Sequence, residues 1–381
     1  MSISSSQSSS FSRATALVLL LASLGISGCG KKDDNVIKIG AVLPLTGSAA
    51  VWGENARMGL EFALDEVNES GGVNGIKVRI ILEDSQSDPA KAVSALQKLI
   101  STDKVSVVIG DIASSSVLAM APIAEKEKVI LFSPGASNPD ISQAGKYIFR
   151  NWQSDALEGA VDAQFAYEVL GYRSISIVYV NNAYGNGLRS VFAQSFQLLG
   201  GEIPVSESFE QGATDIRSQL NKIKATNPEA VYMPGYPPEM ALVLRQSTEL
   251  GLELQFLSVQ AFADPTILET AQNAADGVIF SIPEPPDTSL FVVSNFVRKY
   301  KDRYNRMPGV CSDTGYDALK IIVWAMNQSG VSGPAIQSQL LKLSDFPGAA
   351  GVTNFDENGD VIKSFIFKTV INGEFRPYIS L

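Results

Sequence analysis

The sequence predicts an α/β fold with two sheets of parallel strands and helices on their faces. Short apolar runs typical of buried strands alternate with segments of helical periodicity, as in repeated strand–helix units. This alternation restarts near residue 174, and 381 residues are enough for two such halves. Hydrophobic residues make up 45% and charged residues 18%, a balance that supports a sizeable core without metals or disulfides.

The first half begins with an apolar strand at 37–43. Apolar residues then recur at helical spacing from Ala56 to Val67, and Gly71-Gly72 ends that helix. Asp88 followed by Pro89 is an N-cap with a proline at the first helical position, which predicts a helix reaching residue 100. The further strands expected in this half are 78–82, 105–109 and 129–132.

The second half repeats the pattern. Four strands are expected, at 174–180, 230–233, 256–259 and 278–282. The helices between and after them are expected at 186–199, 215–225, 239–250, 289–304 and 313–327. Parallel strands of this kind need right-handed crossovers, and ligands bind outside their carboxyl ends.

Near the end of the chain, expected strands at 352–355 and 362–370 flank the pentad 356–360. Its Asn358-Gly359 pair is a hairpin signal. The pentad also resembles a calcium-binding loop, but its glycine comes one place early and no glutamate occupies the last ligand position. We interpret the pentad as a turn.

The N-terminus has the pattern of a secretory signal. Residues 1–13 are Ser-rich with one positive charge, and the apolar stretch 14–26 is too short to span a bilayer comfortably. It ends in Ile26-Ser-Gly-Cys29, which resembles a bacterial lipobox, so residues 1–28 are expected to be removed and Cys29 lipidated. Residues 29–35 would then form a tether. The alternative is an ordinary signal peptide with an incidental cysteine.

Composition excludes several classes of function. The net charge of −10 argues against nucleic acid as a partner and suits a soluble domain. The chain has no histidine, which excludes a Ser-His-Asp triad and His-based zinc sites. Its two cysteines, Cys29 and Cys311, cannot form an internal disulfide framework if Cys29 is lipidated. Without a nucleotide fingerprint or a nucleophile–base pair, we expect no enzyme, no metal and no cofactor.

Hydroxyl residues gather where two expected strands end. Ser114, Ser115 and Ser116 open a helix, where unpaired N–H groups and the helix dipole favour an anion. Ser137 and Gly135 follow the next strand, and Gly135 allows close approach of the backbone. Together these residues predict a carboxylate clamp. The alternative is capping and turn chemistry.

Three aromatic residues come shortly after expected strands: Trp52 in the Gly/Ala-rich stretch 47–53, interpreted as a loop, then Tyr184 and Tyr236. Loop aromatics at strand ends can line a pocket. Taken singly, each is more typical of surface packing.

The sequence resembles a known family in an ordered set of motifs. They are Ile37–Gly47 (IKIGAVLPLTG), Asn68–Gly75 (NESGGVNG), Gly110–Ser116, Ser133–Pro139, Ala183–Gly187 and Gly235–Met240. Together they resemble the branched-chain amino-acid binding proteins of bacterial ABC importers, from residue 36 to the C-terminus. The resemblance implies the type I periplasmic binding fold, two Rossmann-like lobes joined by a three-crossing hinge. It implies lobe boundaries of 36–154 with 284–364, and 155–283 with 365–381.

The resemblance also assigns ligand contacts. Ser114 and Ser137 match residues that hold the ligand carboxylate, with Ser115 completing the donor array. Ala113 and Gly135 match backbone contacts, and the Gly135 carbonyl would accept from the ligand ammonium. Trp52, Tyr184 and Tyr236 match aromatic positions of the pocket.

Two positions depart from the family pattern. Gln260 stands where amino-acid binders place a glutamate for the ligand ammonium. Either the ligand lacks an ammonium, as a 2-oxo acid, aromatic acid or amide does, or another acid such as Asp313 or Glu54 replaces the glutamate. The family's disulfide is absent, because Ser87 and Ala113 occupy the matching positions. The remaining cysteine, Cys311, is expected to be a small buried residue near the pocket.

The function that the resemblance implies is ligand capture outside the cytoplasm, not catalysis. A monomer anchored by lipid at Cys29 would close its lobes on a small carboxylate-bearing ligand and dock on an ABC permease. The alternatives are the same fold binding a ligand without an ammonium, and a sensory module that reports to a receptor.

Overall fold

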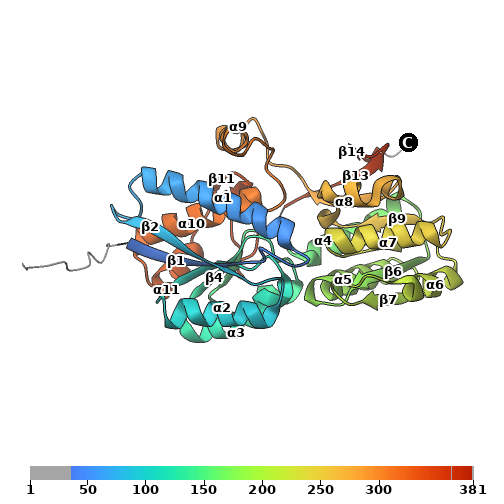
Figure 1. Cartoon of the computed structure of the whole chain (residues 1–381), viewed down its shortest axis with the longest axis horizontal. Helices are drawn as coiled ribbons and strands as arrows, with labels where there is room; N and C mark the ends of the chain where they lie inside the picture. Colours follow the sequence, from blue (N-terminus) through green and yellow to red (C-terminus); the bar gives the residue numbers. More distant parts are fainter. Residues whose placement is uncertain (1–35, 362, 380–381) are drawn as a thin grey trace, which may run out of the picture. The chain divides into compact units, whose positions relative to one another are not determined.

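The computed structural model describes residues 36–361 and 363–379. It confirms the predicted α/β class, since two large sheets have helices packed against them (Figure 1). Every neighbouring pair in the five-stranded first sheet is parallel. The order of that sheet is β2 (Lys77–Asp84), β1 (Val36–Leu43), β3 (Val107–Gly110), β4 (Ile130–Ser133) and β5 (Ile148–Arg150).

Two pairs of helices cover the first sheet. Helices α1 (Ala50–Glu69) and α10 (Ser312–Ser329) pack together, as do α2 (Pro89–Ser101) and α3 (Ser114–Glu127), and Figure 1 shows the two pairs on opposite faces. Helices α1 and α10 approach closely, since a Cβ on Gly59 would lie 1.9 Å from the Ser312 carbonyl oxygen. Asp88 caps α2 as expected, its carboxylate accepting from the N–H groups of Ala90 and Lys91.

The second sheet has seven strands, and five of them are parallel. These five are β7 (Ser206–Phe209), β6 (Ile175–Val180), β8 (Ala230–Tyr232), β9 (Gln255–Ser258) and β10 (Ile279–Pro283). Strand β13 (Phe365–Ile371) is antiparallel to β10, and β14 (Glu374–Pro377) is antiparallel to β13. The end of the chain thus adds an antiparallel edge to an otherwise parallel sheet.

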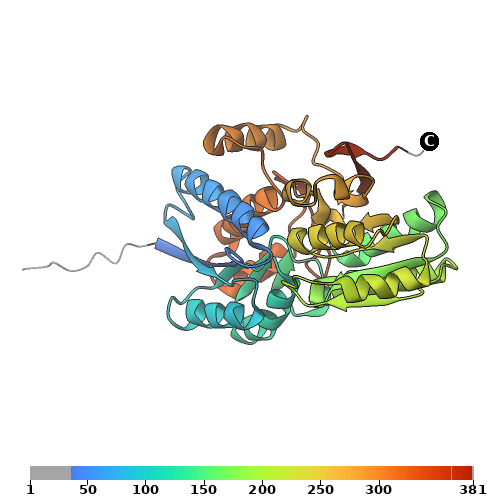
Figure 2. The same cartoon turned by 45° about the vertical axis from the view of Figure 1, so that its right-hand side comes forward.

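Five helices accompany the second sheet. Helices α4 (Asp155–Gln164) and α5 (Ala183–Leu198) pack together. Helices α6 (Arg217–Thr226), α7 (Pro237–Glu249) and α8 (Thr266–Ala271) also contact one another in sequence. Figure 2 shows these helices lying against the strands.

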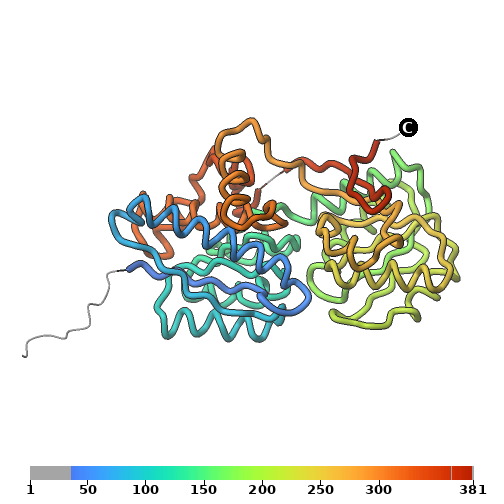
Figure 3. Tube along the Cα trace, turned by 45° about the horizontal axis from the view of Figure 1, so that its top comes forward, coloured from blue at the N-terminus to red at the C-terminus, as the bar shows by residue number. Residues whose placement is uncertain are grey.

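The chain passes between the two sheets three times, as expected for the three-crossing hinge. After β5 it enters the second sheet, and after β10 it returns to the first, where α9 (Phe291–Tyr304), α10, α11 (Gly333–Leu340) and the small sheet of β11 (Phe346–Gly348) and β12 (Gly351–Thr353) lie. It then crosses again to β13, a path that can be followed in Figure 3. The exact lobe boundaries stay predictions.

The strands that flank Asn358-Gly359 do not form a hairpin, although the pair carries a hairpin signal. Strand β12 pairs with β11, and β13 pairs with β10 and β14, so the strands flanking the pentad do not pair with each other. A two-residue hairpin turn of the favoured type needs positive φ at both residues, and Asn358 lacks it. Asn372-Gly373 meets this requirement, with φ of 52° and 72°, and joins β13 to β14.

The pentad forms the predicted turn, which its first aspartate holds. Asp356 Oδ1 accepts from the N–H groups of Asn358 and Asp360 at 2.8 and 2.9 Å. Within 36–361 and 363–379, no group of three or more Cys, Asp or Glu side chains is placed to hold a metal ion.

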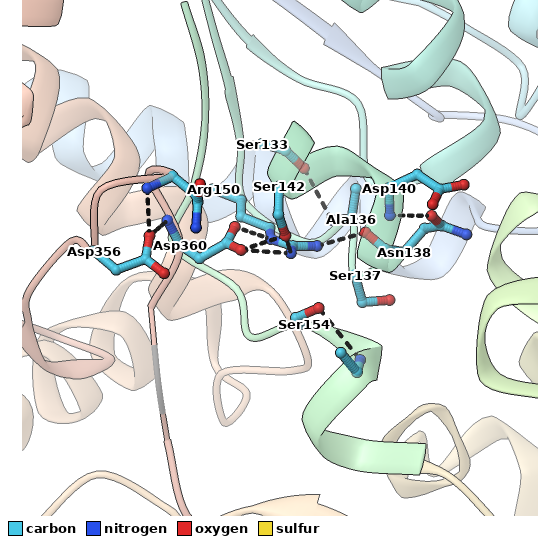
Figure 4. A network of polar contacts seen from close by, with 12 residues as sticks. Ser133, Ala136, Ser137, Asn138, Asp140, Ser142, Arg150, Ser154, Asp356 and Asp360 are labelled. Carbon is cyan, nitrogen blue, oxygen red and sulfur yellow. Dashed lines mark hydrogen bonds and ion pairs between the residues drawn. The ribbon is translucent and has the colours of Figure 1, made fainter. Parts of the chain in front are cut away.

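A buried ion pair lies where the chain first leaves the first sheet (Figure 4). Arg150, the last residue of β5, donates from Nε to Asp360 Oδ1 at 2.6 Å and from Nη2 to Asp360 Oδ2 at 3.0 Å. It also donates to the Asn138 carbonyl at 2.9 Å and to the Ser142 hydroxyl at 2.7 Å. The pair fastens the pentad, which precedes the third crossing, to the strand that precedes the first.

Candidate ligand-binding site

A narrow cavity of about 330 Å³ lies among segments that follow strands of both sheets. Only about 20 Å³ of this volume is open to the centre of a water molecule, so the cavity is nearly closed in this structure. Its lining consists of Trp52, Ile112, Gly135, Ser137, Trp152, Tyr184, Tyr236, Gln260, Ala261, Val310 and Cys311. Six of the nine residues predicted from the sequence are in this set: Trp52, Gly135, Ser137, Tyr184, Tyr236 and Gln260.

The three predicted aromatic residues meet at the cavity. The Tyr184 and Tyr236 rings stack with centroids 5.4 Å apart, and Trp52 approaches Tyr236 edge-on at 5.3 Å. The Trp52 indole N–H and the Tyr236 hydroxyl are buried without a hydrogen-bond partner among the described residues. These groups can therefore serve a polar ligand.

The expectation that Trp52 and Tyr184 lie in loops is wrong. Trp52 lies in the first turn of α1, which starts at Ala50, and Tyr184 is the second residue of α5. Helical geometry starts within a few residues of each strand end, so these rings have a more rigid base than a loop provides. Tyr236 does precede its helix, as the N-cap residue of α7.

The serines at the start of α3 lie behind the lining rather than in it. The Ser114 hydroxyl accepts from the N–H groups of Ser137 and Asn138 at 3.3 and 3.2 Å. The Ser115 hydroxyl accepts from the Ala183 N–H at 3.0 Å. Ala113 is the buried N-cap of α3. Ser114 thus positions Ser137, and Ser115 positions the start of α5. None of the three residues belongs to the cavity lining.

Hydrogen bonds join the two sides of the cavity. Asn138 Nδ2 donates to the Ala183 carbonyl at 2.5 Å, and Gln211 Nε2 donates to the Ser87 carbonyl at 3.3 Å. Each bond connects a segment that follows a strand of the first sheet with one that follows a strand of the second. Separation of the two sides would break both of these hydrogen bonds.

Gln260 is buried at the cavity, and both its backbone N–H and its side-chain oxygen have partners. Its backbone N–H donates to Glu158 Oε1 at 2.7 Å, and its side-chain oxygen accepts from Gln153 Nε2 at 2.5 Å. The acids suggested as substitutes for the family glutamate are elsewhere. Glu54 pairs with Arg57 on the half-exposed side of α1, and neither Glu54 nor Asp313 belongs to the cavity lining.

The sequence analysis misses three acids of α4, Asp155, Glu158 and Asp162, which are buried side by side. Burial raises the pKa of Asp155 to about 7, although the Ser137 hydroxyl and the Arg150 charge act in the opposite direction. Burial raises the pKa of Asp162 to about 8. It also raises that of Glu158, which the charges of the two aspartates raise further.

We expect the ligand-free protein to lose stability as the pH rises from about 5 to 8. The folded-state pKa values of Asp155, Asp162, Asp111 and Asp317 (about 7, 8, 6 and 7) lie above the ordinary value of 3.8. The folded protein then binds more protons than the unfolded chain in this range, so the free energy of unfolding falls with pH. Glu66 acts oppositely, because its pKa is lowered to about 2 and its stabilisation is lost only below about pH 4.5.

The melting temperature measures this dependence. It should be at least about 5 °C lower at pH 8 than at pH 5, and Asp155→Asn should reduce the difference. A melting temperature that is flat or rises between these pH values would contradict the prediction.

Cys311 lines the cavity and is the only cysteine in the described ranges. It is buried, and burial raises the pKa of its thiol well above the ordinary value, so the thiol is not activated. Its backbone adopts a φ of 70°, a conformation that favours glycine.

The fold and the cavity at the strand ends together define a periplasmic binding protein. The sequence matches the family model described as "Periplasmic binding protein" over residues 36–374, and the chain belongs to that family. The relatives that it matches are substrate-binding proteins of transporters and not enzymes.

Three relatives show the range of similarity. The leucine-, isoleucine-, valine-, threonine- and alanine-binding protein of Pseudomonas aeruginosa is 29% identical, with 91% of this chain and 93% of the relative covered. A solved leucine-binding protein from Thermotoga maritima is 33% identical with a TM-score of 0.85, covering 90% and 98% of the two chains. A branched-chain amino-acid transporter substrate-binding protein from Streptococcus pneumoniae, solved with isoleucine, is 26% identical with a TM-score of 0.81, covering 89% and 97%.

The predicted signal sequence, lipidation at Cys29 and tether lie outside the described residues. Within the ranges that are described, no helix is both long and apolar enough to cross a membrane.

Proposed function

We propose that this protein is the solute-binding component of an ABC importer and that it captures a small amino acid in the cavity between its two sheets. The observation that carries the proposal is the cavity itself. Aromatic rings from α1, α5 and the start of α7 enclose it, and a few polar groups, among them Ser137 and Gln260, reach it. A pocket that is mostly apolar with a few placed polar groups suits a small ligand with one polar end.

The amino-acid class is supported by relatives whose names specify leucine, isoleucine, valine, threonine and alanine. The ligand carboxylate would meet the Ser137 hydroxyl at the cavity wall. The side chain would meet Trp52, Tyr184 and Tyr236. The same proposal has three further parts. The two lobes close on the ligand, the protein docks on a permease, and a lipid on Cys29 anchors it.

A second candidate is a ligand without an ammonium, such as a 2-oxo acid or an aromatic acid. Gln260 favours it, because an uncharged amide stands where the related amino-acid binders are expected to carry a glutamate.

Isothermal titration calorimetry tests the proposal. The protein is first unfolded and refolded to remove any bound compound, and then titrated with leucine, isoleucine, valine, threonine and alanine. The 2-oxo acid of leucine and benzoate follow. Binding of one or more of these compounds at micromolar concentration or below is expected, and no binding of any of them would contradict the proposal.

A further inference from the structure

Helix α4 presents a row of acids to the interior. Asp155, Glu158 and Asp162 are spaced three and four residues apart, which places them on one face of the helix. Their exposed fractions are 0%, 0% and 4%. An ionised carboxylate that is buried without a cation is costly, so such groups are normally paired or serve a ligand.

Several oxygens of this row have no partner. Neither carboxylate oxygen of Asp155 makes a hydrogen bond of normal geometry to a described residue, and the same holds for Glu158 Oε2 and Asp162 Oδ1. Arg150, whose charge acts on Asp155, already donates its hydrogen bonds to Asp360, Asn138 and Ser142. The row therefore retains acceptor capacity that the described residues do not fill.

Two of the acids contact residues of the cavity lining, although neither acid is itself part of the lining. The Asp155 N–H donates to the Ser137 carbonyl at 2.7 Å, and Glu158 Oε1 accepts from the Gln260 N–H at 2.7 Å. Ser137 and Gln260 both line the cavity. The charges of Glu158 and Asp155 also contribute to raising the pKa of the Tyr184 hydroxyl, a third lining group. Asp162 lies about one turn further along α4, where it accepts from the Tyr232 hydroxyl at 3.0 Å.

We infer that Asp155, assisted by Glu158, binds the ammonium group of the ligand in place of the missing glutamate, and that the ligand class is therefore amino acids rather than 2-oxo or aromatic acids. An ammonium brings three N–H donors and a positive charge, which match the unfilled carboxylate oxygens. The uncharged Gln260 side chain is then sufficient, because the acids of α4 supply the negative charge that the ammonium needs. Glu158 also accepts a hydrogen bond from the Gln260 backbone N–H. This inference rests on the proposed function.

The test compares leucine with its 2-oxo acid, 4-methyl-2-oxopentanoate, which has the same side chain and carboxylate but no ammonium. In Asp155→Asn, the affinity for leucine should fall at least about tenfold, since a charge-assisted contact is lost. The affinity for the 2-oxo acid should not fall. Glu158→Gln should show the same selectivity and serves as a second variant if Asp155→Asn does not fold. Asp162→Asn neutralises a buried acid of the same helix and should change leucine affinity by less than about threefold.

The outcomes separate the inference from the proposed function. Leucine affinity within about threefold of wild type in both Asp155→Asn and Glu158→Gln would overturn the inference, as would an equal loss for leucine and the 2-oxo acid. A wild-type protein that binds the 2-oxo acid or benzoate but none of the five amino acids would overturn the inference and leave solute binding intact. Binding of none of these compounds would overturn the proposed function itself.

Discussion

Replacing Arg150 with alanine should lower the free energy of unfolding by about 3–5 kcal/mol. The Arg150 side chain is fully buried and that of Asp360 is 11% exposed. Removing the guanidinium leaves the Asn138 carbonyl and the Ser142 hydroxyl without the Arg150 donor, and it leaves the Asp360 carboxylate without a cation and with only the Ser142 hydroxyl as a side-chain donor. The cost is large because a buried charge remains unpaired, not because the ion pair itself is strongly favourable.

Urea unfolding followed by circular dichroism measures this loss. Arg298→Ala is the matched control, because Arg298 pairs with Asp302 on the surface, where both side chains are more than 60% exposed. That variant should lose no more than about 1 kcal/mol. Asp360→Ala should cost about as much as Arg150→Ala, whereas the double variant Arg150→Met with Asp360→Leu should recover part of the loss. Equal stability of Arg150→Ala and Arg298→Ala would refute the argument.

Pattern reading predicts most of the strand–helix units because each buried parallel strand is a short apolar run and most helices have an apolar face. Strand β6, for example, reads ISIVYV and is buried throughout. Helix α4 is not predicted from the hydrophobic pattern, for a physical reason. Its buried face carries Asp155, Glu158 and Asp162, so the apolar stripe that marks a helix is absent. Strand β5 has only three residues, too few to show any period.

The candidate site is predictable in part, because aromatic and hydroxyl residues after strand ends converge at one edge of a sheet. The positions of Ser114 and Ser115 behind the cavity are not predictable, because the partners of these hydroxyls come from other segments, at Ser137 and Ala183. The acids of α4 are not predictable as site residues either, because their partners also come from other segments. Asp155 and Glu158 can be recognised as candidate site residues only in the folded structure, where they contact Ser137 and Gln260.

Replacing Gly135 with alanine should weaken leucine binding at least about tenfold while leaving the fold intact. A Cβ on Gly135 would lie 2.8 Å from Ile112 Cγ2 and 3.0 Å from Cys311 Sγ, and all three residues line the cavity. The added methyl group would therefore occupy space that the ligand needs, and nearby side chains rather than backbone would carry the strain. Calorimetric titration with leucine, together with the melting temperature of the ligand-free variant, separates lost binding from lost stability.

Gly235→Ala is the matched control, since its Cβ would meet Met240 Cγ at an ordinary 3.4 Å and Gly235 does not line the cavity. Cys311→Gly provides a rescue. It removes the sulfur that a Gly135 methyl would contact, and the φ of 70° at Cys311 suits glycine. The double variant Gly135→Ala with Cys311→Gly should bind leucine more tightly than Gly135→Ala but less tightly than Cys311→Gly alone, because the contact with Ile112 remains. If Gly135→Ala binds leucine as tightly as Gly235→Ala does, the ligand lies elsewhere, because a side chain added at the wall of an occupied cavity must compete with the ligand for the same volume.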